Sequence, residues 1–173
     1  MGKGGRMPAG EKCRSSGGGP VDPPQQKSGG PVGPPRWTVL VVDDEEEVRR
    51  VARECIRLAL GEEYRVMEAK GGEEAIDMAQ REQPDLILLD ILMPEVDGFE
   101  VCRRLKASPA TSHIPILFLT ARGEQEAVEI GLGLGGDGYM VKPFNAVSLA
   151  AQVSELVTSA SGARTRRPPT AAG

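Results

Sequence analysis

The sequence predicts an α/β protein with a doubly wound, parallel five-stranded sheet, built from five successive strand and helix units, (βα)5. Continuous apolar runs without polar alternation are typical of strands covered on both faces, and several occur along the chain. Between them, apolar residues recur at steps of three and four, as on one face of a helix. Alternating strands and helices with short connections imply parallel strands joined by right-handed crossovers, with helices on both faces of the sheet.

Five apolar runs of strand length are predicted to be strands: residues 38–42, 64–68, 86–90, 114–119 and 138–141. The first is rich in β-branched residues. The third, Leu86 to Leu89, is apolar throughout and stops on Asp90, which suits the middle of a parallel sheet. In the fourth, Pro115 stands near the start, where its missing N–H donor is tolerated.

Five segments with helical apolar spacing are predicted to be helices: residues 48–59, 73–83, 99–105, 124–134 and 147–157. Gly61 is the predicted stop of the first helix, whose apolar face consists of Val48, Val51, Ala52, Cys55, Ile56 and Ala59. Pro84 ends the second helix.

The last three helices carry their own signals. Asp97-Gly98 is predicted to be a turn before the third helix. Glycines from Gly131 to Gly136 weaken the end of the fourth by about 1 kcal/mol for each interior glycine, so we expect this segment to be unusually mobile. The apolar spacing of the last helix runs out at Val157.

The length of 173 residues and the hydrophobic content of 39% fit one domain with extensions. Residues 1–36 contain ten Gly and seven Pro and few large apolar side chains, so we expect a disordered arm. Residues 158–173 are expected to be a disordered tail, which leaves 37–157 as the folded domain. The arm and tail carry net charges of +4 and +3, so the domain carries the −11 that leaves the chain at −4. These basic ends could bind the acidic domain or an anionic partner, although solvated ends are the simpler expectation.

Several kinds of site and segment are excluded by composition. No apolar stretch reaches membrane-helix length, and the first thirty residues lack a signal-peptide core, so we expect a cytoplasmic protein without membrane contact. The three cysteines suggest neither a disulfide framework nor a zinc site, and Cys55 and Cys102 are expected to be packed, reduced thiols. His113, the only histidine, is predicted to be a solvated loop residue, which excludes a multi-histidine metal site.

Polar groups follow four of the predicted strands: Asp43-Asp44, Asp90, Thr120 and Lys142. The carboxyl ends of parallel strands lie at one edge of a sheet, so we expect these side chains to meet. Each has an ordinary explanation by itself, as a helix cap or a solvated charge. Three clustered carboxylates, however, repel one another unless a cation lies among them.

A hard divalent cation suits this set, and Mg²⁺ is the natural one because it binds through one or two carboxylates, water and substrate phosphate. With a phosphoryl donor present, Asp90 on the central strand is the best nucleophile and would form an aspartyl phosphate. Lys142, the Thr120 hydroxyl and the metal would then stabilise the phosphoryl oxygens.

Across about residues 37–157 the chain resembles the receiver domain of bacterial two-component response regulators, whose fold is flavodoxin-like with strand order 2-1-3-4-5. The matching segments, in the family's order, are Val41-Val42-Asp43-Asp44, Leu88 to Pro94, Asp97-Gly98, Leu119-Thr120-Ala121 and Gly138 to Phe144. The resemblance implies that Asp90 accepts a phosphoryl group and that Asp43, Asp44, Asp90 and the Leu92 backbone carbonyl arrange Mg²⁺. It also implies a cis peptide bond before Pro143.

The same resemblance implies a switch, in which Thr120 moves toward the phosphoryl group and Tyr139 turns inward. This would alter the surface of the fourth helix, fifth strand and last helix, where a downstream protein would bind. Leu92 and Arg122 flank the expected path of the attacking water and are poorly suited to orient it. We therefore expect a long-lived phosphorylated state.

The phosphoryl donor is expected to be another protein, a sensor histidine kinase or a histidine phosphotransfer protein, because His113 is the only histidine and lies in a loop. Sixteen residues after 157 are too few for an output domain, so the resemblance suggests a stand-alone receiver. We expect a signalling phosphoacceptor that assists its own phosphorylation and dephosphorylation, not an enzyme, and no nucleic-acid partner beyond weak binding by the basic ends.

Three other functions share parts of this pattern. A haloacid-dehalogenase-like phosphohydrolase needs a second aspartate two residues after the nucleophile, where this chain has Leu92. A flavodoxin-like flavin binder needs a phosphate-cradling first loop, which Asp43-Asp44 would repel. A scaffold that is never phosphorylated does not need the complete set of acids, Thr120 and Lys142.

Overall fold

The structure is a computed structural model that describes residues 35–121 and 125–164. Its five strands form one parallel sheet in the order β2-β1-β3-β4-β5, which confirms the predicted fold class and strand order. The strands are β1 (Trp37–Val42), β2 (Tyr64–Ala69), β3 (Leu86–Asp90), β4 (Ile116–Thr120) and β5 (Gly138–Val141). The helices are α1 (Glu46–Leu60), α2 (Gly72–Glu82), α3 (Gly98–Ala107), α4 (Gln125–Gly133) and α5 (Ala146–Arg164), with a 3-10 turn, η1 (Gly61–Glu63), after α1.

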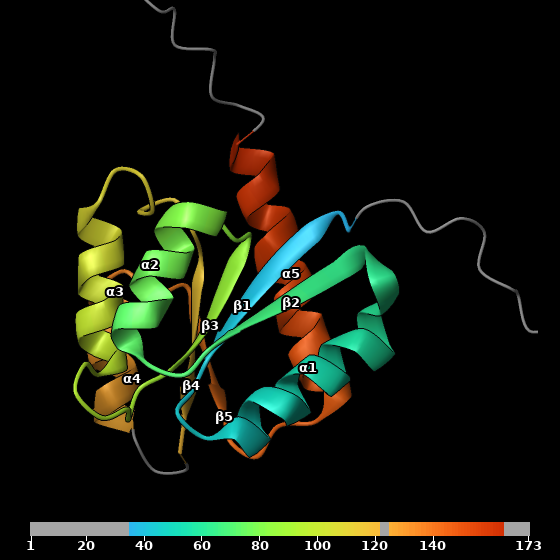
Figure 1. The fold of residues 1–173 in the computed structure, drawn as a ribbon, viewed down its shortest axis with the longest axis horizontal. Coiled ribbons are helices and arrows are strands. Elements are labelled where there is room, and N and C mark those ends of the chain that lie inside the picture. Colours follow the sequence, from blue (N-terminus) through green and yellow to red (C-terminus); the bar gives the residue numbers. More distant parts are fainter. Residues whose placement is uncertain (1–34, 122–124, 165–173) are drawn as a thin grey trace, which may run out of the picture. The chain divides into compact units, whose positions relative to one another are not determined.

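The helices cover both faces of the sheet (Figure 1). Helices α1 and α5 lie together on one face, and α2, α3 and α4 on the other. Each face has its own hydrophobic cluster, one shared with α1 and α5 and one with α2 and α3. The sheet therefore forms the middle of three layers.

This layering explains the unbroken apolar runs. In β1, Val39 and Val41 pack on the side of α1 and α5, whereas Leu40 and Val42 pack on the opposite side. All four are fully buried, and β3 alternates in the same way. Successive side chains of a strand point to opposite faces, and each fully buried large aliphatic side chain stabilises the fold by about 1.5–3 kcal/mol.

One helix boundary follows its sequence signal and one departs from it. Gly61 ends α1 with φ 74°, a conformation that favours glycine, as predicted. Asp97, however, is not part of a free turn: its side chain caps α3, accepting a hydrogen bond from the Glu100 amide at 2.8 Å. Gly98 is the first residue of α3.

The surface of α1 differs from the prediction. Val51 is 41% exposed and Ala59 is also exposed, although both were assigned to the apolar face. The buried residues of α1 are Ala52 and Ile56, which the apolar spacing also predicts, and Arg49, which it does not. Apolar spacing marks a face without fixing its width, and α1 has a broader apolar surface than the sheet covers.

The predicted thiols and histidine lie as expected: Cys55 and Cys102 are free thiols and His113 is exposed. Helix α5 is longer than predicted, because it continues past Val157 to Arg164. The Thr158 hydroxyl donates to the Ser154 carbonyl, and the Ser161 hydroxyl donates to the Val157 carbonyl. These small residues add no apolar spacing, so the sequence pattern stops before the helix does.

Some expectations concern residues outside the described part of the chain. These residues are 1–34, which make up most of the predicted arm, 165–173, which end the predicted tail, and 122–124, which include Arg122. Among the described helices, none is both long and apolar enough to cross a membrane.

Two glycines at the end of α4 lie against an aromatic ring. A Cβ atom added to Gly131 would lie 2.7 Å from the ring of Phe118, and one added to Gly136 would lie 2.5 Å from it. Phe118, on β4, is fully buried and also contacts the ring of Phe99. Close packing against Phe118 therefore explains why glycine occupies these two positions. The expected mobility of the segment stays a prediction.

Gly131→Ala is expected to destabilise the protein by about 1–3 kcal/mol, because the added methyl overlaps the Phe118 ring in a filled core. Gly133→Ala is the matched control, since nothing lies within 4 Å of its added Cβ, and it should be neutral or slightly stabilising. Urea unfolding of both variants measures the difference. Equal stabilities for the two variants would contradict this account of the glycines.

Candidate functional site

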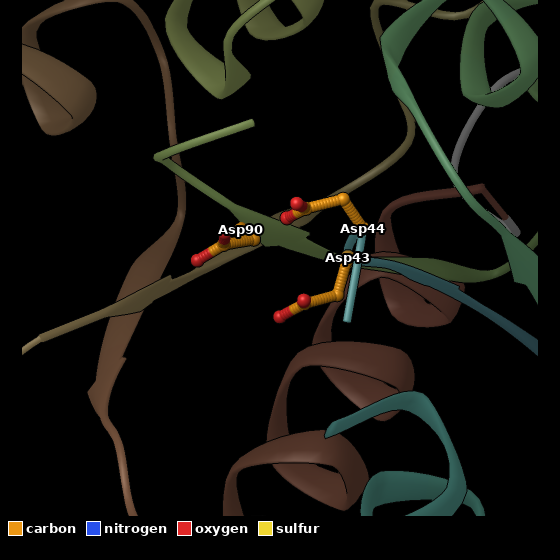
Figure 2. Close-up of side chains that lie close together, drawn as sticks. All are labelled: Asp43, Asp44 and Asp90. Atoms are coloured by element: carbon orange, nitrogen blue, oxygen red, sulfur yellow. The ribbon is translucent and has the colours of Figure 1, made fainter. Parts of the chain in front are cut away.

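Three acidic side chains gather at the carboxyl edge of the sheet (Figure 2). Asp43 and Asp44 follow β1, and Asp90 is the last residue of the adjacent strand β3. One carboxylate oxygen from each lies within 4.8 Å of the others. Asp43 and Asp90 are buried, whereas Asp44 is exposed, so the cluster opens to solvent on the side of Asp44.

Hydrogen bonds fix the turn that carries the first two acids. The Asp43 amide donates to the Ala69 carbonyl at 3.3 Å, which continues the pairing of β1 with β2. One Asp43 carboxylate oxygen, Oδ1, accepts from the Glu45 amide at 2.9 Å. The other, Oδ2, faces Lys142. Asp43 is therefore both a structural part of the loop and a member of the cluster.

Lys142, the residue after β5, brings a positive charge to the cluster. Its Nζ atom donates to Asp90 Oδ1 at 2.8 Å and to Asp43 Oδ2 at 3.2 Å. The Lys142 amide also donates to the Thr120 carbonyl at 2.7 Å, which extends the register of β4 and β5 by one residue. The peptide bond between Lys142 and Pro143 is cis, as the family resemblance implies.

Burial and charge shift two pKa values at this site. Burial raises the pKa of Asp90 to about 6; the hydrogen bond from Lys142 works against this, while the charges of Asp43 and Asp44 add to it. Burial by itself would lower the pKa of Lys142, but the hydrogen bond and charge of Asp90, with those of Asp43, raise it overall. Lys142 is therefore a cation at neutral pH. Its attraction does not fully offset the free-energy cost of ionising the buried Asp90 carboxyl, whose pKa stays raised.

The other predicted site residues lie around this cluster. Thr120 ends β4 next to Asp90 on β3 and is 1% exposed, and its hydroxyl donates to the Ala121 carbonyl at 3.2 Å. Leu92 and Tyr139 do not join the acids with their side chains, which are 65% and 46% exposed. The structure thus brings together Asp43, Asp44, Asp90 and Lys142, places Thr120 on the adjoining strand end, and leaves the Leu92 and Tyr139 side chains at the surface.

Two further residues shape the site in ways that the sequence does not indicate, although Gly98 belongs to a predicted turn. A Cβ on Gly98 would overlap the carbonyl oxygen of Asp90, so only glycine allows α3 to start this close to the end of β3. Arg49, on α1, is 4% exposed and donates to the backbone carbonyls of Asp43 and Asp44. An Asp-Gly pair fits many turns, and an arginine within a helix usually lies on the solvated face.

Chemically, the cluster is a set of oxygen donors with excess negative charge and one ammonium group. Carboxylate oxygens are the ligands of hard divalent cations such as Mg²⁺, which retain several waters and use one or two protein carboxylates. An open side at Asp44 leaves room for those waters or for a substrate. The donor set therefore fits a divalent cation bound together with an anionic group.

Comparison with known families gives one match over most of the described chain. The family model for the response regulator receiver domain matches residues 39–154. Among curated proteins, the chain is 42% identical over 119 residues to the probable transcriptional regulator ycf27 of Cyanophora paradoxa, covering 69% of this chain and 47% of that protein. It is 42% identical over 123 residues to the transcriptional regulatory protein ResD of Bacillus subtilis, covering 71% and 49%. The chain spans about half the length of these relatives.

Two solved structures agree with this chain in fold. A putative response regulator from Chloroflexus aurantiacus is 34% identical with a TM-score of 0.66, and the match covers 70% of this chain and 98% of that one. The chemotaxis protein CheY4 of Vibrio cholerae is 32% identical with a TM-score of 0.64, and here the match covers 69% and 98%.

Asp90→Asn is expected to stabilise the metal-free protein. The folded-state pKa of about 6 lies above the ordinary value of 3.8, so above pH 6 the ionised carboxylate opposes folding. As the pH falls through 6 toward 4, Asp90 takes up a proton in the folded state and this opposition disappears. With a chelator at pH 7.5, the substitution should raise the free energy of unfolding by about 1–3 kcal/mol, and the gain should shrink toward pH 4.

Denaturant unfolding at the two pH values measures this gain. Asp77→Asn, at an exposed position on α2, is the matched control and should leave the stability close to wild type at both pH values. A gain from Asp90→Asn that does not change between pH 7.5 and 4 would be inconsistent with a charge effect at this site.

Proposed function

The chain belongs to the family of response regulator receiver domains, and from this premise we propose that Asp90 accepts a phosphoryl group from a histidine of a partner protein. The observation that carries the proposal is the Asp90 carboxylate, held 2.8 Å from an ammonium group within a cluster of three acids at the sheet edge. The donor would be a sensor histidine kinase or a histidine phosphotransfer protein. The transfer makes the chain a signalling component of a two-component system.

In the proposed reaction, an Asp90 carboxylate oxygen attacks the phosphorus atom of the phosphohistidine. The new O–P bond of an acyl phosphate forms as the P–N bond breaks, and the imidazole leaves with the bonding pair. Lys142 would bind a phosphoryl oxygen, a role supported by its 2.8 Å hydrogen bond to Asp90. The Thr120 hydroxyl, at the end of the adjoining strand, would bind another after a small movement.

Asp43, Asp44 and Asp90, with the Leu92 backbone carbonyl, would hold Mg²⁺. When bound, Mg²⁺ would neutralise the crowded carboxylates and the charge of the phosphoryl group. The donor set and the opening at Asp44 support this assignment.

We also propose that the face formed by α4, β5 and α5 carries the signal to a downstream protein. Four apolar side chains of α4 and β5 are more than 40% exposed: Ile130, Leu132, Tyr139 and Val141. Between β5 and α5 lies a groove whose lining includes Gln152, and among the described residues the buried Oε1 atom of Gln152 has no hydrogen-bond partner. A protein partner would cover the exposed apolar side chains. Such a role places the protein in the cytoplasm with its kinase.

Incubation with acetyl phosphate and Mg²⁺ is expected to add one phosphoryl mass to the wild-type protein and none to Asp90→Asn. The substitution removes the nucleophilic oxygen while keeping the shape of the side chain. Intact-protein mass spectrometry measures both, and Asp77→Asn is the control that should react like wild type. An unmodified wild-type protein, or a fully modified Asp90→Asn variant, would refute the proposal.

The phosphorylated state is expected to be long-lived, because the exposed Leu92 side chain cannot orient the attacking water by hydrogen bonding. Leu92→Gln should shorten its lifetime by offering an amide at the same position, whereas Leu58→Gln, at an exposed leucine of α1, should not. Decay of the phosphoryl mass after removal of acetyl phosphate gives the rates. A wild-type half-life of seconds would contradict the expectation.

A further inference from the structure

Arg49 is the charged side chain that lies behind the acid cluster. It comes from the first turn of α1, and its side chain is only 5% exposed. Buried arginines need partners for their donors because an unpaired buried charge is costly. The partners of Arg49 therefore indicate why a cation is buried at this position.

Those partners are the backbone of the acid pair and a carboxylate of β2. Nη1 donates to the Asp43 carbonyl at 2.7 Å and to the Asp44 carbonyl at 3.1 Å. Nε donates to Glu68 Oε2 at 3.4 Å, and the other oxygen of Glu68 accepts from Arg53 at 2.6 Å. One guanidinium thus joins the Asp43-Asp44 turn to the neighbouring strand.

We propose that Arg49 is a positioning residue for the metal-binding carboxylates, acting through the backbone of Asp43 and Asp44. The inference rests on the proposed function, because it needs a cation at the acid cluster. Both carbonyls bonded by Arg49 belong to residues whose carboxylates would hold that cation. Fixing them sets the direction in which the two side chains leave the turn.

Geometry and charge predict opposite effects on metal affinity, which makes the role testable. A positive charge near the cluster by itself disfavours a divalent cation, so its removal alone would tighten binding. If the Arg49 guanidinium instead positions Asp43 and Asp44, its removal weakens Mg²⁺ binding. Lysine keeps the charge but lacks the planar fork that bonds two carbonyls and a carboxylate together. Arg49→Lys and Arg49→Met therefore separate the two effects.

Mg²⁺ affinity is measured by isothermal titration calorimetry on the full chain. Both Arg49 variants are expected to bind Mg²⁺ about 10- to 100-fold more weakly than wild type, as for other residues that orient metal ligands. Arg53→Lys and Arg53→Met are the matched controls, because Arg53 bonds the same Glu68 and, within the described part of the chain, donates no hydrogen bond to Asp43 or Asp44. They should bind like wild type.

A second measurement needs no metal. Amide hydrogen exchange with a chelator present should be faster at Asp44 and Glu45 in Arg49→Lys than in wild type, and unchanged there in Arg53→Lys. Thermal unfolding confirms that each variant folds, and Arg49→Lys decides the result if Arg49→Met does not fold.

The outcomes distinguish this inference from the proposed function. Wild-type affinity and exchange in Arg49→Lys, or tighter binding in Arg49→Met, would overturn the positioning role while leaving the metal site in place. A wild-type protein that binds no Mg²⁺ would overturn the proposed metal site and this inference with it, even if exchange at Asp44 and Glu45 changed as expected.

Discussion

Lys142 places one ammonium group from the end of β5 against Asp90 on β3 and Asp43 after β1. These contacts depend on the strand order, because β4 and β5 must add to the same side of β3 before the lysine can reach the two acids. The charges at this edge do not balance, because the cluster has three carboxylates and one ammonium group. The pKa of Asp90 accordingly stays raised, at about 6. The site therefore retains an excess of negative charge that a divalent cation can neutralise.

The remainder of the fold holds this edge in place. Two hydrophobic clusters, one on each face of the sheet, fix the strands whose ends carry the acids. Close packing of two backbone segments also holds Asp90 in position, because α3 begins at Gly98 directly against the Asp90 carbonyl. On the opposite side of the cluster, α1 contributes Arg49 beneath the Asp43-Asp44 turn. Packing and hydrogen bonding thus orient groups whose charges would otherwise drive them apart.

Much of this arrangement could be predicted from the sequence, because strand ends are easy to locate. A run such as Leu86 to Leu89 stops on Asp90, and parallel strands bring such stops to one edge. Residues that act through contact with the backbone of another segment could not be identified from the ends of apolar runs. Gly98 resembles any turn glycine, and Arg49 resembles a solvated helix residue until the Asp43 and Asp44 carbonyls lie beside it. The end of α5 was also missed, since Thr158 and Ser161 extend it through local hydrogen bonds and not through apolar spacing.

The central claim is that chemistry at the sheet edge takes place on Asp90 and not on the two neighbouring acids. Borohydride reduction converts an acyl phosphate to an alcohol and leaves free carboxylates unchanged, so it marks the phosphorylated side chain. Peptide mass spectrometry after treatment with acetyl phosphate and Mg²⁺ then locates the mark. We expect reduction at residue 90 alone and no reduction when Mg²⁺ is withheld. Reduction at Asp43 or Asp44, or at none of the three, would contradict it.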